Sequence, residues 1–387
     1  MEHVSRYVPI ELADSLCLLL TTWGRYTKST MYSVDILRHE QRAGLRSPSC
    51  TRVRLTQNEC VRSLKNERTV TLPWSRVHSP LPEEQQLSVL SSTLPLTLII
   101  MSRIWLITGA SSGFGLELAR IAAHQGDRVL AASRTPEKLG SLVSSDKVKP
   151  VYLDHNKPLP EIQTAVKDIL AIHGTVDLVV NNAAYVQTGM LEEVSPDDTL
   201  RQFQANTLGP LNLYRALLPH FREKGTGAFI TIGSMAAWYP MPGCNLYNAS
   251  KAALRWIAIG LAGEISQFGI KHCLVEPGFF RTELLNPSAN ISGTNQSSRL
   301  PAYKELNSTT DANFAAFHGA QLGDPVKGAQ VIYDVVTSSG AATGRSLPEL
   351  LPLGSDASEE ISKSASKTLA SVEEFKAISA LSDIPKA

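Results

Sequence analysis

The 387-residue sequence predicts an α/β fold, a doubly wound parallel sheet with helices on both faces, preceded by a poorly ordered N-terminal extension. Two observations lead to this prediction. From residue 101 onward, short apolar runs alternate with segments of helical spacing, which is the pattern of right-handed βαβ units. Before that residue, no helical or strand period is sustained beyond short stretches such as Tyr7–Leu20.

The apolar runs of the second part have the length of buried strands. They lie at Ile104–Ile107, Val129–Ala132, Val151–Leu153, Leu178–Val180, Ala228–Ile232 and His272–Val275. The segments with helical spacing are Gly113–His124, Pro136–Val143, Leu159–Ile172, Asp198–Phe221, Leu246–Phe268, Asp324–Val336 and the stretch around Ser358–Lys376. Residues 279–322 interrupt this alternation with many Ser and Asn residues, and we expect a substrate lid there.

The first hundred residues differ in composition from the rest of the chain. They hold 10 of the 21 Arg but only 2 of the 16 Lys and 2 of the 25 Gly. Their polar middle, from about Arg38 to Arg76, can bury little apolar surface. A targeting or regulatory extension is one interpretation. We favour a disordered or non-functional extension over residues 1–100, because Met101 directly precedes the first strand and residues 101–387 suffice for a single domain.

Charge and cysteine content exclude several classes of function. A formal net charge of +1 gives no field that would hold nucleic acid. The five cysteines form no CxxC pair and the nine histidines no HxxxH pair, so we expect neither a disulfide framework nor a metal site. No apolar run reaches the roughly 18 residues that span a bilayer. Together these features favour a cytoplasmic protein without a transmembrane segment.

A glycine-rich segment, Thr108–Gly115, connects the first strand to the first helix. Glycines permit a tight turn and let a pyrophosphate approach the backbone N–H groups, and a helix N-terminus attracts negative charge. A glycine-rich turn without a ligand is the alternative. We predict a dinucleotide-binding turn of a Rossmann-type fold, made by Gly109, Ser111, Ser112, Gly113, Phe114 and Gly115.

The end of the second strand indicates which dinucleotide is bound. An acidic residue there would bind the adenosine ribose 2′-hydroxyl, but this chain has Ser133 and Arg134 instead. A hydroxyl and a guanidinium favour the 2′-phosphate of NADP(H), although Arg134 could also be an ordinary surface arginine. Asp154, at the end of the third strand, either accepts from the adenine amino group or caps the next turn.

Tyr247 and Lys251 lie four residues apart at the start of a predicted helix, hence on one face. Ser234 precedes them by thirteen residues, at the carboxyl end of the fifth strand, where ligands of doubly wound sheets bind. A phenol with a pKa near 10 is a poor acid or base at neutral pH. We expect the Lys251 ammonium and a positive nicotinamide to lower the pKa of Tyr247, and Ser234 to hold the substrate oxygen beside it.

In these residues the chain resembles the classical short-chain dehydrogenases/reductases. The resemblance covers Ser102 to Leu285 closely and the C-terminal part loosely. It rests on the TGxxxGxG pattern of Thr108–Gly115, Asn181-Asn182-Ala183-Ala184, Asn206, Ser234, Tyr247-x-x-x-Lys251 and Pro277-Gly278. Ala184 stands where the family pattern ends in Gly, a small change in a mainly structural element.

The resemblance implies a role for each matching residue. Tyr247 would be the catalytic acid/base, and Lys251 would bind the nicotinamide ribose while tuning Tyr247. Ser234 would orient the carbonyl group and Asn206 would hold a water in the proton relay. Further cofactor contacts would come from Asn182, Pro277, Gly278 and Thr282, the last at a position that often contacts the carboxamide.

The leading functional hypothesis is an NADP(H)-dependent oxidoreductase that interconverts a secondary alcohol and a ketone or aldehyde. The substrate would be a small to medium apolar molecule. The opening of the glycine-rich segment and the Arg134 environment resemble the steroid- and retinol-type branch, but this resemblance does not identify a substrate. A homodimer or homotetramer is possible. Two alternatives stay open: a non-catalytic dinucleotide-binding regulator, and the same fold catalysing epimerisation or dehydration.

Overall fold

The computed structural model describes most of the second part of the chain and three segments of the first. The described residues are 16–21, 31–38, 49–56, 102–286 and 290–384. The chain divides into two units, Met1–Met101 and Ser102–Ala387.

In the N-terminal unit, three strands form an antiparallel sheet in the order β1-β2-β3. They are β1 (Leu16–Thr21), β2 (Met31–Arg38) and β3 (Ser49–Thr56). The sequence did not predict these strands, and charged residues interrupt the apolar residues of β2 and β3. The prediction of poor order for the remainder of residues 1–100 lies outside the described residues.

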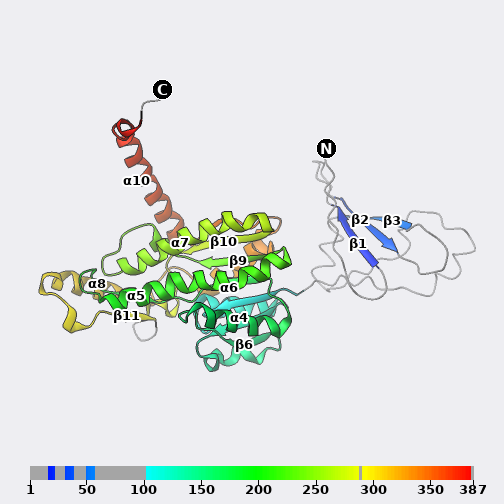
Figure 1. Cartoon of the computed structure of the whole chain (residues 1–387), viewed down its shortest axis with the longest axis horizontal. Coiled ribbons are helices and arrows are strands. Elements are labelled where there is room, and N and C mark those ends of the chain that lie inside the picture. Colours follow the sequence, from blue (N-terminus) through cyan, green and yellow to red (C-terminus); the bar gives the residue numbers. More distant parts are fainter. Residues whose placement is uncertain (1–15, 22–30, 39–48, 57–101, 287–289, 385–387) are drawn as a thin grey trace, which may run out of the picture. The chain divides into compact units, whose positions relative to one another are not determined.

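The C-terminal unit is built on seven parallel strands (Figure 1). Their order across the sheet is β12-β10-β9-β7-β4-β5-β6, so the chain winds outward from β4 in both directions. The strands are β4 (Ile104–Thr108), β5 (Arg128–Ser133), β6 (Val148–Tyr152), β7 (Leu178–Asn181), β9 (Gly227–Ile232), β10 (Ile270–Pro277) and β12 (Leu350–Leu353). The first six contain the predicted apolar runs or overlap them. This confirms the predicted α/β class and the doubly wound parallel sheet.

Helices cover both faces of the sheet, and each face has its own apolar core. On one face Trp105 and Ile332 are fully buried together with Leu118. On the other face Phe221 and Phe229 pack in the same way, and Figure 1 shows the helices of this face in front of the strands. The first face carries α3 (Gly113–His124), the 3-10 helix η2 (Pro136–Ser144) and α9 (Pro325–Thr337), and the second α4 (Leu159–His173), α6 (Gly209–Lys224) and α7 (Asn245–Ile265).

The segment predicted as one helix over Asp198–Phe221 is interrupted. It consists of α5 (Pro196–Phe203), a π-helical turn η3 (Gln204–Leu208) and α6. Pro210 lies in the first turn of α6, where its missing N–H group removes a helical hydrogen bond. The wider turn buries Asn206 completely, so the interruption lies at a predicted site residue.

Residues 279–322, the predicted lid, contain several short elements. β11 (Ile291–Gly293) pairs in parallel with β8 (Val186–Thr188), which follows β7 in the chain, and the two form a separate two-stranded sheet. The same residues 279–322 also contain the 3-10 helices η6 (Glu283–Leu285), η7 (Gln296–Ser298) and η8 (Pro301–Tyr303) and the helix α8 (Lys304–Phe317).

The chain then returns to the sheet through β12 and continues into α10 (Ser355–Ser379), followed by a 3-10 turn η10 (Ala380–Ser382). α10 is the longest helix of the described part of the chain. Within the described residues, no helix is both long enough and apolar enough to span a membrane.

Candidate active site

The turn between β4 and α3 has the shape that a bound phosphate requires. Gly109 and Gly113 adopt φ angles of 63° and 53°, in the left-handed region that favours glycine. A Cβ atom on Gly115 would lie 2.4 Å from the carbonyl oxygen of Gly109. α3 begins at Gly113 without a side chain capping its N-terminus. Its first backbone N–H groups are therefore left for an anionic ligand.

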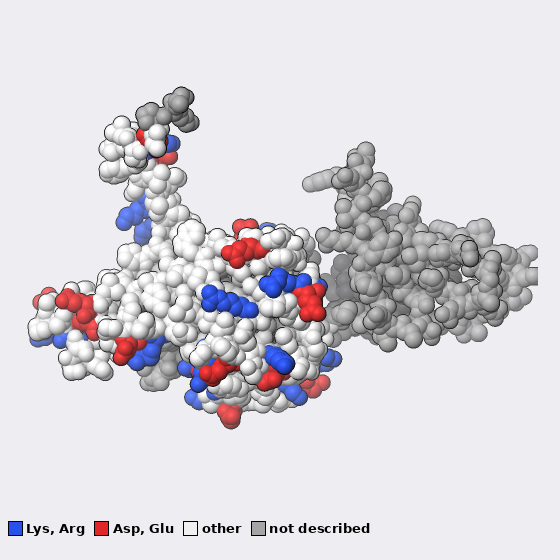
Figure 2. Space-filling view, in the orientation of Figure 1, with Lys and Arg blue, Asp and Glu red and all other residues white. Residues whose placement is uncertain are grey.

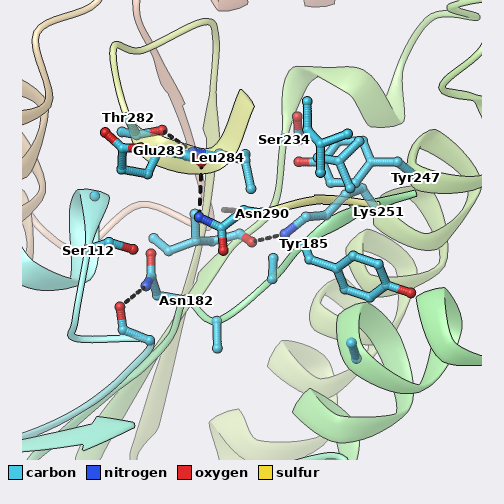
Figure 3. Close-up of a pocket in the computed structure, with 18 of the residues that line it drawn as sticks. Ser112, Asn182, Tyr185, Ser234, Tyr247, Lys251, Thr282, Glu283, Leu284 and Asn290 are labelled. Carbon is cyan, nitrogen blue, oxygen red and sulfur yellow. Dashed lines mark hydrogen bonds between the residues drawn. The ribbon is translucent and has the colours of Figure 1, made fainter. Parts of the chain in front are cut away.

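Asn182 holds this turn in place through hydrogen bonds to Thr108. Its side-chain amide donates to the carbonyl oxygen of Thr108 at 2.9 Å, and its backbone N–H donates to the Thr108 hydroxyl at 2.9 Å. The same hydroxyl accepts from the backbone of Ala183 at 3.1 Å. Figure 3 shows Asn182 beside Ser112 at one side of the cleft. Asn182 thus joins the end of β7 to the glycine-rich turn, and a direct contact with the cofactor stays a prediction.

The residues after β5 and β6 lie at the same edge of the sheet. The hydroxyl of Ser133 accepts from the backbone N–H of Thr135 at 3.0 Å, and Arg134 is exposed. Among the described residues, no carboxylate forms an ion pair with Arg134. Asp154 caps the following turn through a 3.0 Å bond from the backbone N–H of Asn156. This is one of the two roles predicted for Asp154.

Ser234, Tyr247 and Lys251 lie together beyond the carboxyl end of β9 (Figure 3). Ser234 begins the 3-10 helix η4 (Met235–Ala237), and its hydroxyl accepts from the backbone N–H of Ala236 at 3.1 Å. Lys251 lies one turn after Tyr247 in α7, with its Nζ atom 6.0 Å from the centre of the Tyr247 ring. The Lys251 ammonium donates to the carbonyl oxygen of Ile232 at 2.8 Å, which fixes it over the strand end.

Burial is the main cause of the pKa shifts of Tyr247 and Lys251. It raises the pKa of Tyr247, and a hydrogen bond with Ser234 opposes that rise. Burial lowers the pKa of Lys251 to about 8, although the nearby carboxylate of Glu276 acts to raise it. The sequence leads us to expect the Lys251 ammonium and a positive nicotinamide together to lower the pKa of Tyr247. Without the cofactor, loss of solvation raises this pKa, so the expectation for the cofactor complex stays a prediction.

Glu276, the last residue before Pro277, forms a cluster with Trp238 and Arg255 near Lys251. It is completely buried, accepts from the Trp238 indole N–H at 2.7 Å, and pairs with Arg255 through both carboxylate oxygens at 3.1 Å. The Arg255 guanidinium lies 4.1 Å from the Trp238 ring centre. Burial raises the pKa of Glu276, while Trp238 and Arg255 lower it. The Glu276 carboxylate raises the pKa of Lys251, while Arg255 balances its charge within the cluster.

Asn206 connects the π-helical turn to the backbone of Tyr247. Its side-chain oxygen accepts from the backbone N–H of Tyr185 at 3.2 Å, and its amide donates to the Tyr185 carbonyl oxygen at 3.0 Å. The amide also donates to the hydroxyl of Ser250 at 3.2 Å, and Ser250 donates to the Tyr247 carbonyl oxygen at 2.7 Å. The side chain of Asn206 therefore holds α7 in register with β8 and its preceding loop.

One cleft of about 1500 Å³ runs from the glycine-rich turn to Tyr247 and Lys251. All predicted site residues line it except Gly115 and Asn206, which lie behind its wall. The structure therefore brings the phosphate-binding turn and the Ser234, Tyr247 and Lys251 side chains to one cavity. In the described part of the chain, no cluster of three or more His, Cys, Asp or Glu could hold a metal ion.

Comparison with known proteins identifies the family. The sequence profile of the short chain dehydrogenases matches residues 103–291. The oxidoreductase BOA17 of Botryotinia fuckeliana is 33% identical over 287 residues, which cover 72% of this chain and 98% of that protein. The chain belongs to the short-chain dehydrogenase family. It is an oxidoreductase of that family, and solved structures of this fold include complexes with NADP and with NAD.

Two further relatives of this short-chain dehydrogenase are informative. A solved short-chain dehydrogenase from Streptomyces avermitilis is 34% identical, with a TM-score of 0.65, over 73% of this chain and 100% of that one. The 3-ketodihydrosphingosine reductase of Bacteroides thetaiotaomicron is 36% identical over 191 residues, 49% of this chain and 68% of that protein.

Sequence reasoning missed several residues that line the cleft of this short-chain dehydrogenase. His155 lines the cleft next to Asp154, and burial lowers its pKa to about 4. The Tyr247 end of the cleft is apolar and comes from four separated segments. Its walls include Val186, Met241, Cys244, Leu284, Leu285, Ile291 and Phe314. No local motif marks these positions, because they lie far apart in the sequence, in β8, before α7, in η6 and β11, and in α8.

Proposed function

We propose that this short-chain dehydrogenase interconverts a secondary alcohol and a ketone or aldehyde, with NADP(H) as cofactor and Tyr247 as acid/base. The observation that carries the proposal is the single cleft lined both by the glycine-rich turn and by Ser234, Tyr247 and Lys251. A dinucleotide at the turn supplies or accepts a hydride. The protein's own residues would then position the substrate and move one proton.

Tyr247 would donate its phenolic proton to the substrate oxygen during reduction. The Ser234 hydroxyl, which hydrogen-bonds Tyr247, would hold that oxygen at the correct distance. The Lys251 ammonium would favour the phenolate that remains, because an opposite charge stabilises the ionised form. Asn206 would act through the backbone of α7, since its side chain is occupied by Tyr185 and Ser250. In the direction of oxidation the same groups would work in reverse.

The choice of NADP(H) rests on the end of β5. Arg134 is exposed at the cleft, forms no ion pair with a described carboxylate, and follows Ser133, whose hydroxyl hydrogen is free to be donated. No acidic residue stands where one would repel a 2′-phosphate. The other residues we propose for cofactor contact are Gly109, Ser111, Ser112, Gly113, Phe114, Asp154, Asn182, Pro277, Gly278 and Thr282.

The substrate would be a small to medium apolar carbonyl compound or alcohol. The support is the apolar wall around Tyr247, in which Val186, Cys244 and Tyr247 itself are buried together. Similarity to a 3-ketodihydrosphingosine reductase agrees with a ketone substrate. Residues 279–322 supply Leu284, Leu285 and Ile291 to that wall, and we assign them to covering the substrate. A cytoplasmic location is part of the same proposal.

Two other functions remain for the same fold. A non-catalytic dinucleotide-binding regulator would need no acid/base group, so the buried Tyr247 and Lys251 beside Ser234 speak against it. Epimerisation or dehydration would use the same cleft but would show no net consumption of cofactor.

The proposal is tested by following NADPH and NADH oxidation at 340 nm with a panel of apolar ketones and aldehydes. We expect turnover with NADPH on at least one ketone, and a preference for NADPH over NADH. Cofactor binding without oxidation across the panel would favour a regulator. Conversion of a hydroxylated substrate without net cofactor consumption would favour epimerisation or dehydration.

A further inference from the structure

The helix α8 packs on the domain mainly through polar side chains. Its buried residues are Asn307 and Thr310, and no apolar residue of α8 is fully buried. Figure 1 shows α8 at one end of the domain, and Figure 2 shows Asp and Glu side chains on the surface of that end. A helix of 14 residues is marginal in water by itself, and its usual support is an apolar face packed on a core. The contacts of Asn307 and Thr310 therefore decide where α8 lies.

Asn307 is hydrogen-bonded to Glu193, a buried residue of the segment between β8 and α5. The Asn307 amide donates to both carboxylate oxygens of Glu193, at 2.9 and 3.0 Å. The backbone N–H of Leu300, just before η8, donates to the same carboxylate at 2.8 Å. Burial raises the pKa of Glu193, but hydrogen bonds, chiefly those from Leu300 and Asn307, outweigh it, so this pKa lies below its usual value. Hydrogen bonds to an ionised acceptor of this kind are stronger than those between neutral groups.

Thr310, three residues after Asn307, packs on the backbone of Gly243. Gly243 has a φ angle of 75°, and a Cβ atom there would collide with the Thr310 side chain. The Gly243 carbonyl oxygen accepts from the backbone N–H of Gly189, at the end of β8, at 2.9 Å. Two residues after Gly243 the chain enters α7, whose first turn contains Tyr247. α8 therefore contacts the segment that leads directly to Tyr247.

Phe314 lies on the same side of α8 as these two contacts. It follows Thr310 by four residues and Asn307 by seven, which places the three side chains in one row along the helix. Phe314 lines the Tyr247 end of the cleft and packs against the buried side chains of Cys244 and Tyr247. The hydrogen bonds of Asn307 fix the rotation of α8 about its axis, and with it the position of the Phe314 ring.

We propose that Glu193 is a positioning residue for the substrate: its carboxylate holds α8 in place, and α8 in turn holds Phe314 as the side chain that bounds the apolar substrate beside Tyr247. This inference rests on the proposed function, because it takes the Tyr247 end of the cleft as the substrate site. Glu193 is not one of the residues that line the cleft, so it acts through α8. An apolar contact of this kind stabilises bound substrate and transition state alike, so its loss raises KM and leaves kcat unchanged.

The role of Glu193 in holding α8 is tested first without substrate, by hydrogen–deuterium exchange of the backbone amides of residues 300–317 in the full chain. Glu193→Ala removes the acceptor of the Leu300 N–H and of the Asn307 amide. We expect exchange in this segment to become at least about tenfold faster, the factor that corresponds to one lost hydrogen bond to a charged group. Glu305→Ala makes the same chemical change at an exposed position of α8 and should leave the exchange as in the wild type.

The effect on the substrate is then measured with NADPH and an apolar ketone that the wild-type chain reduces. Glu193→Ala and Phe314→Ala should each raise KM about tenfold, the scale of one lost apolar side-chain contact, with kcat and the NADPH dissociation constant within about twofold of the wild type. The double variant should have the KM of Phe314→Ala alone, because Glu193 has no further effect once the ring that it positions is gone. Glu305→Ala should again match the wild type.

Unchanged exchange of residues 300–317 in Glu193→Ala would overturn the proposal, as would faster exchange spread evenly over the whole domain. Multiplied effects on KM in the double variant would also overturn it, because Glu193 would then act on something other than Phe314. If Glu193→Ala does not fold, Asn307→Ala removes the donor of the same contact and should give the same confined increase in exchange. A wild-type chain that reduces no ketone would refute the proposed function, and the exchange comparison would still decide whether Glu193 holds α8.

Discussion

The glycine-rich turn can be tested by adding one methyl group to it. In Gly115→Ala the new Cβ atom would lie 2.4 Å from the Gly109 carbonyl oxygen and 2.6 Å from the Asn182 amide nitrogen. Ordinary contact begins near 3.4 Å, so the backbone of the turn must move by roughly 1 Å. Overpacking of this kind costs about 1–3 kcal/mol of unfolding free energy. The same movement displaces the N–H groups that we expect to bind the phosphates.

Gly263→Ala is the matched control, because it makes the same chemical change in a helix where a Cβ atom meets nothing within 4 Å. That variant should gain up to about 1 kcal/mol from helix propensity. Thermal unfolding should therefore separate the two variants by several degrees, at about 2–4 °C per kcal/mol. Fluorescence titration with NADPH should show weaker binding for Gly115→Ala alone. Equal melting temperatures and equal NADPH affinities would refute the close packing described for this turn.

Three further predictions concern cofactor choice, Lys251 and the first hundred residues. Arg134→Ala should weaken NADPH binding by about 1.5–3 kcal/mol, the value of a hydrogen bond to a charged group, and leave NADH binding unchanged; equal losses for both cofactors would contradict a 2′-phosphate contact. Glu276→Gln removes the carboxylate that raises the pKa of Lys251. Since the ammonium is lost as pH rises through that pKa of about 8, NADPH affinity should begin to fall at lower pH than in the wild type, and an unshifted pH profile of the dissociation constant would contradict the coupling. Deletion of residues 1–100 should change the melting temperature by no more than a few degrees and preserve cofactor binding, whereas aggregation would show that the segment covers an apolar face.

The sequence predicted the strands of the main sheet wherever a strand contains an uninterrupted apolar run. The strand that was missed, β12, has the sequence Leu-Leu-Pro-Leu and contains Pro352. Proline gives no N–H group to a ladder, so such a run argues against a strand in the middle of a sheet. β12 pairs only with β10 and lies at the edge, where proline is tolerated.

The sequence predicted residues of the candidate site only where a local pattern, such as a glycine-rich turn or a helical spacing, marks them. Gly109, Gly113 and Gly115 are required by backbone geometry, and Tyr247 with Lys251 follows helical spacing, so sequence reasoning found them. The π-helical turn at Asn206 was missed, although Gly209-Pro210 is a signal for a break in a helix. The apolar wall could not be found, because its residues come from segments far apart in the sequence that meet only in the folded chain.

The Glu276, Arg255 and Trp238 cluster was also absent from the sequence reasoning. Its members are 17 and 21 residues apart along the chain, and none follows a motif that predicts a contact. They meet because the end of β10 lies beside the middle of α7 and the segment after β9. The buried carboxylate near Lys251 is therefore something that only the folded chain reveals.

The central claim is that Tyr247 transfers the proton in a cleft that also holds the cofactor. It is tested most directly by Tyr247→Phe, which removes only the phenolic hydroxyl, measured for both NADPH affinity and NADPH-linked turnover on a ketone that the wild-type chain reduces. We predict nearly unchanged NADPH affinity together with turnover reduced at least about 100-fold, the low end of the contribution of general acid–base catalysis. Near-normal turnover in Tyr247→Phe would contradict the account and show that another group transfers the proton.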